Sequence, residues 1–268
     1  MDEFVYDVFN DEKWWWSVGR RALVNKLWKK YGNGSKEPLV LDIGCGTGTT
    51  LKELNRAGRG YGMDVSTTAL AYCLQRGIDS VCVGDASRVP YRDERFDLVI
   101  SVDVIEHVED DVGVMQEMLR VTKPGGLIIF TVPAFQFLWS RRDEQCHHVR
   151  RYRLSEVKEK ATKAGLQTLR STYVNLPLLV PLFILGKVGD LLGPIKRAVF
   201  RRREPSYGID YVQVPRPINM LLGLVMRAEA RWLAALDQPL GAGITYVAVK
   251  PEAAPRQSEE RSQERVGA

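Results

Sequence analysis

The stretch VLDIGCGTGTT, residues 40–50, decides the fold of this chain. It runs from apolar residues into Asp42 and then into three glycines at alternate positions. The apolar residues predict a buried strand, and the glycines predict a tight turn in which a ligand can approach the main chain. A dinucleotide-binding turn would read G-x-G-x-x-G, but the third glycine position holds Thr49. The carboxylate of Asp42 would repel a pyrophosphate and could pair with an ammonium group, so the turn favours a ligand that carries one.

Composition sets the size and class of the protein. A chain of 268 residues, 45% hydrophobic and 26% charged, fits one large α/β domain with additions. The acidic opening MDEFVYDVFNDEK lacks the apolar segment of a signal peptide, so we expect a cytoplasmic protein. The four cysteines have no paired spacing, which indicates neither a zinc site nor a disulfide framework.

Short apolar runs rich in Val and Ile alternate with stretches that can be helical. The runs are residues 39–45, 58–66, 79–87, 95–104 and 125–133, and the stretches include 49–57, 67–76 and 110–121. This alternation predicts a doubly wound α/β fold with a parallel sheet. A helix over 153–165, capped by Ser155, would be followed by a sixth strand at 166–176 and a seventh at 243–251.

Several segments resemble class I S-adenosylmethionine-dependent methyltransferases. LDIGCGTG is similar to motif I of that family, and Asp64 follows Asp42 by 22 residues, as the ribose-binding acid of the family does. GDASRVPY (84–91), FDLVISVDVIEHVED (96–110) and LRVTKPGGLIIFTVP (119–133) then follow in family order. The resemblance covers about 39–176 and 243–251. It implies a Rossmann-like sheet of seven strands in the order 3-2-1-4-5-7-6.

The same resemblance implies S-adenosylmethionine as cofactor. Asp64 would accept hydrogen bonds from the ribose hydroxyls, and Asp85 would accept one from the exocyclic amine of the adenine. The cofactor-binding residues that the resemblance implies are Asp42, Gly44, Cys45, Gly46, Thr47, Gly48, Asp64, Val65, Asp85, Ala86, Ser101 and Val102.

Five parts of the chain are expected to differ in role. They are an N-terminal helical cap (1–37), a cofactor-binding core (38–176), a helical insertion between the last two strands (177–240), the last core strand (241–251) and a disordered tail (252–268). Because the sixth strand runs parallel to the first, its end opens on the cofactor edge of the sheet. We therefore expect the insertion to form a lid or platform for the acceptor.

The insertion begins apolar and then turns basic. Its apolar part, interrupted by Pro177 and Pro181, is too short for a membrane span, and it is followed by the basic cluster Lys196, Arg197, Arg201, Arg202 and Arg203. This pattern suits peripheral contact of residues 176–203 with the inner face of an anionic membrane. It also suits a helical cap with arginines on its solvated side. Either interpretation favours a hydrophobic or lipid-linked acceptor.

A first cluster of candidate catalytic residues follows the fourth strand. Asp103, Glu106 and His107 form D-x-x-E-H, which resembles an acid-x-x-acid-His cluster that is associated with a divalent metal in ubiquinone-pathway O-methyltransferases. The E-H-V part is common in the wider family without a metal, so we expect no metal here. His107 would lie near the methyl group.

A second cluster follows the fifth strand. It resembles the D-x4-H-x-R-R-Y pattern of a bacterial subgroup with a Trp-rich N-terminus, and here the pattern falls on Asp143, His148, Arg150, Arg151 and Tyr152. His148 is a candidate general base with Asp143 as its partner, and His107 is the competing candidate. Arg150 or Arg151 could hold an anionic acceptor group. We expect the acceptor to contact Trp15, Trp139, Arg150, Arg151 and Tyr152. The alternative is that Asp143, Arg151 and Tyr152 brace the loop.

These patterns predict an enzyme that transfers a methyl group to a small hydrophobic or lipid-linked acceptor, at oxygen. The alternatives are C- or N-methylation of a quinone-like or natural-product ring, and a SAM-binding protein without transferase activity. No N-P-P-[YF] tetrapeptide follows the fourth strand, where VDVI stands, so we expect no nucleic-acid substrate.

Overall fold

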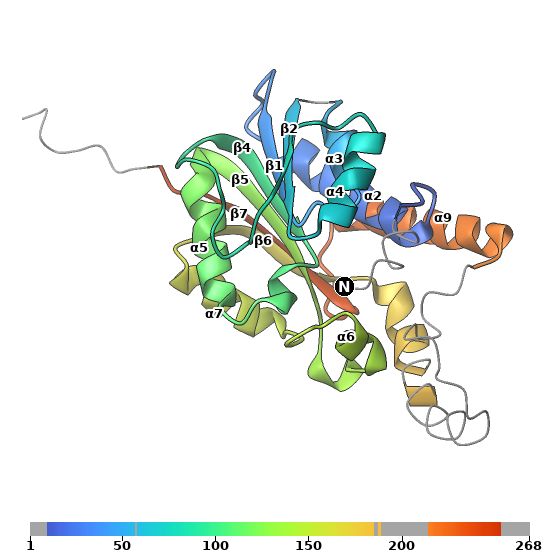
Figure 1. The fold of residues 1–268 in the computed structure, drawn as a ribbon. Helices are drawn as coiled ribbons and strands as arrows, with labels where there is room; N and C mark the ends of the chain where they lie inside the picture. The colour runs from blue at the N-terminus through green and yellow to red at the C-terminus, as the bar shows by residue number, and fades with distance from the viewer. Residues whose placement is uncertain (1–9, 57, 185–186, 189–213, 253–268) are drawn as a thin grey trace, which may run out of the picture.

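A computed structural model describes residues 10–56, 58–184, 187–188 and 214–252 (Figure 1). Its centre is a seven-stranded sheet in the order β3-β2-β1-β4-β5-β7-β6, which confirms the predicted fold class and strand order. The strands are β1 (Leu39–Ile43), β2 (Arg59–Asp64), β3 (Val81–Val83), β4 (Phe96–Val102), β5 (Thr122–Pro133), β6 (Gln167–Val174) and β7 (Gly243–Val249). The pairs among β1 to β5 are parallel, and β7 runs antiparallel to both β5 and β6.

Helices cover both faces of the sheet. They are α2 (Trp15–Tyr31), α3 (Thr49–Leu54), α4 (Thr67–Gln75), α5 (Asp111–Val121), α6 (Arg141–Gln145), α7 (Leu154–Lys163) and α9 (Arg216–Leu233), with short 3-10 turns η1 (Ile105–His107) and η2 (Gln136–Leu138). Local sequence explains two of the starts, because the side chain of Ser66 accepts from the Ala69 N–H and that of Asp110 accepts from the Gly113 N–H. The predicted cap Ser155 is wrong, since α7 begins at Leu154 with Arg153 as its N-cap.

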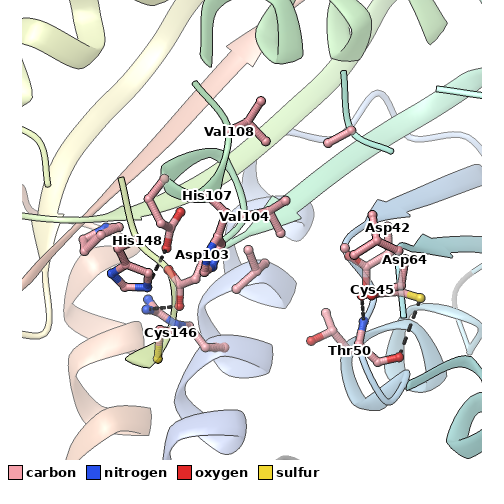
Figure 2. Close-up of a pocket in the computed structure, with 18 of the residues that line it drawn as sticks. Asp42, Cys45, Thr50, Asp64, Asp103, Val104, His107, Val108, Cys146 and His148 are labelled. Atoms are coloured by element: carbon pink, nitrogen blue, oxygen red, sulfur yellow. Dashed lines mark hydrogen bonds and ion pairs between the residues drawn. The ribbon is translucent and has the colours of Figure 1, made fainter. Parts of the chain in front are cut away.

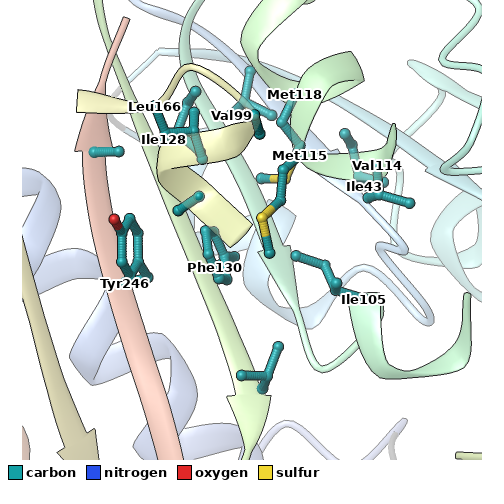
Figure 3. Packing of buried hydrophobic residues seen from close by; sticks show 14 of the residues in the cluster. Ile43, Val99, Ile105, Val114, Met115, Met118, Ile128, Phe130, Leu166 and Tyr246 are labelled. Carbon is teal, nitrogen blue, oxygen red and sulfur yellow. The ribbon is translucent and has the colours of Figure 1, made fainter. Parts of the chain in front are cut away.

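The core lies in two layers, one on each face of the sheet. On one face, α5 and α7 pack over β4, β5 and β7, with Met115, Phe130 and Tyr246 in one buried cluster (Figure 3). The rings of Phe130 and Tyr246 are stacked with their centroids 5.0 Å apart. On the other face, Leu27 of α2 and Leu233 of α9 belong to a second buried cluster with residues of the same strands. Each fully buried side chain of this size contributes about 1.5–3 kcal/mol.

Helices α2 and α9 lie side by side, although about 200 residues separate them in sequence (Figure 1). Gly19 permits the close approach, because a Cβ there would lie 2.8 Å from the Cβ of Met226. The side chain of Asn219 joins α9 to the start of α2, because it accepts from the Trp15 N–H at 3.0 Å and donates to the carbonyl of Lys13 at 2.8 Å. The N-terminal helix and the second half of the insertion therefore form one layer.

The insertion leaves and rejoins the sheet at a narrow neck. Asn175, directly after β6, has a positive φ of 63°, and its carbonyl accepts from the N–H groups of Leu178 (3.1 Å) and Ala242 (3.4 Å). A side chain at Gly241 would overlap the backbone of Val174, so only glycine fits there. The chain thus departs at 175 and returns at 241–242 with its two ends in contact.

Two features expected from the sequence lie outside the described residues. They are the basic cluster at 196–203 and the tail from residue 253. Within the part of the chain that the structure describes, no helix is long and apolar enough to cross a membrane.

Candidate active site

The glycine turn between β1 and α3 forms the floor of the site. Gly44, Gly46 and Gly48 all have positive φ (73°, 52° and 76°), which is the backbone conformation that favours glycine. A side chain at Gly44 would also overlap that of Val104. The N–H groups of Gly44 and Cys45 donate to the carbonyl of Met63 at 2.8 and 3.0 Å, which fixes the turn against the end of β2.

Two acids at neighbouring strand ends face this turn. The carboxylate of Asp64, at the end of β2, accepts from the N–H groups of Gly46 (2.8 Å) and Ser66 (2.9 Å). The carboxylate of Asp85, after β3, accepts from the backbone N–H and the hydroxyl of Ser87 at 2.8 and 2.7 Å. These hydrogen bonds from Ser87 lower the pKa of Asp85. Both carboxylates are thereby held in fixed positions.

Asp42 is the most deeply placed acid of the turn, at 2% exposure. Burial raises the pKa of its carboxyl well above the usual value, and negative charge at Cys73 and Asp64 adds to the effect. A bound cationic group would stabilise the charged form of this carboxylate. The position therefore suits the ammonium group of a ligand.

A cavity of about 450 Å³ opens above the turn. It brings together ten of the twelve predicted cofactor residues: Asp42, Gly44, Cys45, Gly46, Thr47, Asp64, Val65, Asp85, Ala86 and Val102. The other two, Gly48 and Ser101, lie outside the lining. Gly48 instead forms the N-cap of α3, and Ser101 is fully buried within β4.

A histidine cluster forms the opposite wall of the cavity (Figure 2). His148 Nδ1 lies 2.8 Å from Asp143 Oδ1, and the guanidinium of Arg151 donates to both oxygens of Asp143 at 2.7 and 3.0 Å. Burial alone would raise the pKa of Asp143, but these hydrogen bonds outweigh burial and lower its pKa to about 2. Asp143 is therefore a buried, charged partner that orients His148.

His107 lies against His148. Their ring centroids are 4.8 Å apart with an angle of 76° between the planes. Nδ1 of His107 lies 3.2 Å from the carbonyl oxygen of His147. Burial and the neighbouring His148 lower the pKa of His107 to about 4, so His107 is neutral at physiological pH.

Glu106 completes this wall, with no exposed surface. Neither of its carboxylate oxygens has a hydrogen-bond partner in the described parts of the chain, and Oε1 lies 3.9 Å from Nε2 of His148. Burial, followed by the nearby negative charge of Asp103, raises the pKa of Glu106 well above its usual value.

The N-terminal helix contributes three lining residues that the sequence analysis missed, Trp16, Ser17 and Arg20. Arg20 Nη2 donates to Asp103 Oδ2 at 2.5 Å, and its guanidinium stacks 4.3 Å above the centre of the Trp16 ring. Asp103 has a positive φ of 56° and also accepts from the hydroxyl of Thr131 at 2.8 Å. The spacing of apolar residues in the helix carried no signal for Arg20, because its partner is 83 residues away.

Of the five predicted acceptor contacts, Arg151 alone lines the cavity, and Trp16 takes the place expected for Trp15. The backbone N–H of Trp15 donates to Asn219 of α9, and its ring contacts those of Trp14 and Trp16. Trp139 also lies outside the lining. Arg150 pairs with Glu109 and Asp111 on the far side of the loop. Tyr152 is fully buried and donates to Asp111 at 3.0 Å. The structure places these four residues outside the cavity lining, and the loop folds back on α5 with Arg150 and Tyr152 as braces.

A seven-stranded sheet of this order, with a glycine turn and acids at three strand ends around one cavity, defines the class I S-adenosylmethionine-dependent methyltransferase fold. Residues 41–130 match the family described as a methyltransferase domain, and S-adenosylmethionine is the cofactor of this class. This match spans about a third of the chain and includes β2 to β4 and most of β1 and β5.

Three curated relatives match part of the chain. Norajmaline N-methyltransferase of Rauvolfia serpentina is 38% identical over 112 residues (37% of this chain, 37% of the relative). A tRNA (carboxymethyluridine(34)-5-O)-methyltransferase of Arabidopsis thaliana is 37% identical over 97 residues (35% and 24%). Demethylmenaquinone methyltransferase of Mycolicibacterium paratuberculosis is 33% identical over 139 residues (48% and 56%). The chain therefore spans between about a quarter and just over half the length of these relatives.

Solved structures share the fold. YcgJ from Bacillus subtilis superposes with a TM-score of 0.56 at 18% identity, covering 87% of this chain and 100% of that one. Phosphoethanolamine N-methyltransferase 2 of Haemonchus contortus, in complex with S-adenosyl-L-methionine, gives 0.54 at 20% identity, covering 85% and 52%. Identity at this level speaks for the fold alone.

Proposed function

We propose that this chain transfers the methyl group of S-adenosylmethionine to an oxygen atom of a small, hydrophobic or lipid-linked acceptor. One observation carries the proposal: a single cavity has the glycine turn with its acids on one wall and the histidine cluster on the other (Figure 2). A cofactor on the first wall would direct its methyl group toward an acceptor on the second. Positioning supplies much of such a reaction, since the cofactor carries its own leaving group.

The cofactor half follows from the acids and from Arg20. Asp64 would accept from the ribose hydroxyls, and Asp85 from the adenine amine. Asp42 would meet the ammonium group of the methionine end. Nε and Nη1 of Arg20 are buried at the cavity without a partner among the described residues, and they suit the methionine carboxylate.

The acceptor half consists of His148 and His107, which would contact the acceptor oxygen, and Asp143, which holds His148 in place. Leu182, in the first part of the insertion, and Ala242, just after its end, line the same cavity and give it an apolar side. An apolar side favours a hydrophobic acceptor.

The outer surface of α9 supports a lipid-linked acceptor that is methylated at an anionic membrane. Its solvent-facing residues include Met220, Leu221 and Leu224, each at least 60% exposed. Arg227 and Arg231 are also exposed there, whereas the acid within α9, Glu229, is buried. A surface of apolar and basic residues suits the interface of an anionic bilayer.

Sedimentation with vesicles tests the membrane contact. Vesicles of anionic phosphatidylglycerol should retain the full chain, and neutral phosphatidylcholine vesicles should retain less. Replacing both Leu221 and Leu224 with serine should weaken retention, and the control Leu74→Ser, at an exposed leucine of α4, should not. Equal retention by both vesicle types, or none, would reject this part of the proposal.

The transfer itself is tested by incubating the chain with labelled S-adenosylmethionine and separate lipid, small-molecule and RNA fractions. Label in a lipid or small-molecule product, attached through oxygen, is expected. A product labelled at carbon or nitrogen of a ring would favour the second candidate, which relatives named for norajmaline and demethylmenaquinone support. Label in RNA would reject both, and cofactor binding without any product would indicate a non-catalytic protein.

A further inference from the structure

We propose that Glu106, His107 and His148 form a binding site for one divalent transition-metal ion on the acceptor side of the cavity. This inference rests on the proposed function, because it names how the histidine cluster would act on the acceptor oxygen. It departs from the sequence-based expectation that no metal is bound.

The first argument is the distance between the three side chains. One ligand atom from each, a carboxylate oxygen and two ring nitrogens, lie within 4.8 Å of one another. A metal ion holds such ligands at about 2.0–2.2 Å, so bound ligand atoms are about 3–4 Å apart. Small side-chain rotations that move these ligand atoms by about 1 Å would therefore bring all three within binding distance of one ion.

The second argument is the orientation of the two rings. Nδ1 of His148 is engaged by the carboxylate of Asp143, and Nδ1 of His107 by the carbonyl of His147. Each ring therefore has Nε2 available for a ligand. Histidines that bind metals are typically held in this way, with the other ring nitrogen bonded to a carboxylate or a backbone carbonyl.

The third argument is the state of Glu106. Its carboxylate is fully buried at the cavity, and both oxygens lack a hydrogen-bond partner among the residues that the structure describes. A buried polar group without a partner is costly. The cations Arg20 and Arg151, which act on Glu106 through their charge, donate their hydrogen bonds to Asp103 and Asp143. A metal ion would satisfy this carboxylate.

The ligand set indicates the kind of ion and its role. Two imidazoles and one carboxylate on one side of an ion leave its other positions open, and such a set suits zinc, iron(II) or cobalt(II). An acceptor hydroxyl bound at an open position would have a lower pKa and would lose its proton to water. The oxygen would then form the new O–C bond while the S–C bond breaks and its electron pair stays on sulfur. His148 would act as a ligand and not as the base.

Cobalt(II) titration of the metal-stripped full chain tests the site. Visible absorption bands of bound cobalt and calorimetry should report one site per chain, and zinc should displace the cobalt. Glu106→Gln and His148→Ala should each weaken cobalt binding by at least 10-fold. The matched control is His147→Asn, because His147 is the third histidine of the chain, its side chain is exposed, and asparagine tolerates its positive φ of 58°.

The absence of a cobalt site in the unaltered chain would overturn the inference, as would equal cobalt binding by His148→Ala and His147→Asn. His107→Asn provides a third ligand variant if Glu106→Gln does not fold. S-adenosylmethionine binding is measured on the same samples. Cofactor binding without a metal site would overturn this inference alone, whereas loss of cofactor binding in the unaltered chain would reject the proposed function.

Discussion

Arg20 Nη2 lies 2.5 Å from Asp103 Oδ2, which joins the N-terminal helix to the end of strand β4 at the cavity. The two residues are far apart in sequence, and the side chain of Arg20 is only 9% exposed. This ion pair therefore fixes the N-terminal helix against the end of β4 at the cavity.

Replacing Asp103 with asparagine should destabilise the fold by about 2 kcal/mol. The buried guanidinium would lose its charged partner, and the cost should be below the 3–5 kcal/mol of a fully buried pair because Asp103 is 25% exposed. Asparagine tolerates the positive φ, so backbone strain does not contribute. Urea unfolding measures the change. The control is Asp93→Asn, which removes an exposed partner of Arg120 and should cost less than about 1 kcal/mol. Equal losses in the two variants would contradict the prediction.

Asp64→Ala should weaken S-adenosylmethionine binding by about 10- to 100-fold. The variant removes the proposed acceptor for the ribose hydroxyls and also the bonds that hold Gly46 and Ser66. Hydrogen bonds to a charged group contribute about 1.5–3 kcal/mol. Calorimetry measures the affinity, and the exposed Asp79→Ala is the control. Unchanged affinity in Asp64→Ala would remove Asp64 from the cofactor site.

His148→Ala should lower turnover by about 100-fold or more while S-adenosylmethionine affinity stays within about twofold. A group that acts at the reacting atoms contributes on this scale, and His148 lies on the wall opposite the glycine turn. The measurement is the rate at which label from S-adenosylmethionine enters the product that the fractionation experiment identifies. His147→Asn should keep nearly full activity. A parallel loss of cofactor binding in His148→Ala would place this residue in the cofactor half.

Asp111→Asn should cost about 1–3 kcal/mol of stability at pH 7, and this loss should shrink as pH falls below about 4. Burial alone would raise the pKa of Asp111, but hydrogen bonds from Lys160, Arg150 and Tyr152 outweigh it and lower the pKa. A carboxyl whose pKa is lower in the folded chain stabilises the fold above its unfolded pKa, and this contribution disappears as pH falls through the folded pKa. Urea unfolding from pH 3 to 7 measures it. Glu109→Gln, an exposed partner of Arg150, should change little.

The sequence was sufficient to predict the sheet and to place the glycine turn and its neighbouring acids at one edge of it. These features depend on residues that are close together in sequence. The glycine turn follows β1 directly, and Asp64 and Asp85 lie at or just after the ends of β2 and β3. Parallel strands bring such ends to one edge, so chain order alone places the acids together. The same logic placed His148 and His107 at one cavity, because both follow strands that end at that edge.

The contacts that depend on rotation of a helix or on a loop turning back were not predictable. Three adjacent tryptophans differ only in helical angle, so the sequence could not decide between Trp15 and Trp16. Arg150 and Arg151 are neighbours, yet they point to opposite partners, Asp111 and Asp143. Ser155 failed as a cap because α7 begins two residues earlier than the capping pattern suggested, with Arg153 as its N-cap.

The neck at Asn175 and Ala242 has a consequence for how such a protein can diversify. The chain leaves the sheet and returns to it at one point, and Leu182 and Ala242 lie beside the cavity. Residues 176–241 are therefore one continuous addition whose two ends adjoin. Evolution or an engineer could exchange this stretch for another that also covers the apolar face of α2, and the sheet and the glycine turn would keep their spacing. One methyl-donating core could in this way serve a series of unrelated acceptors, with selectivity inherited through one insertion.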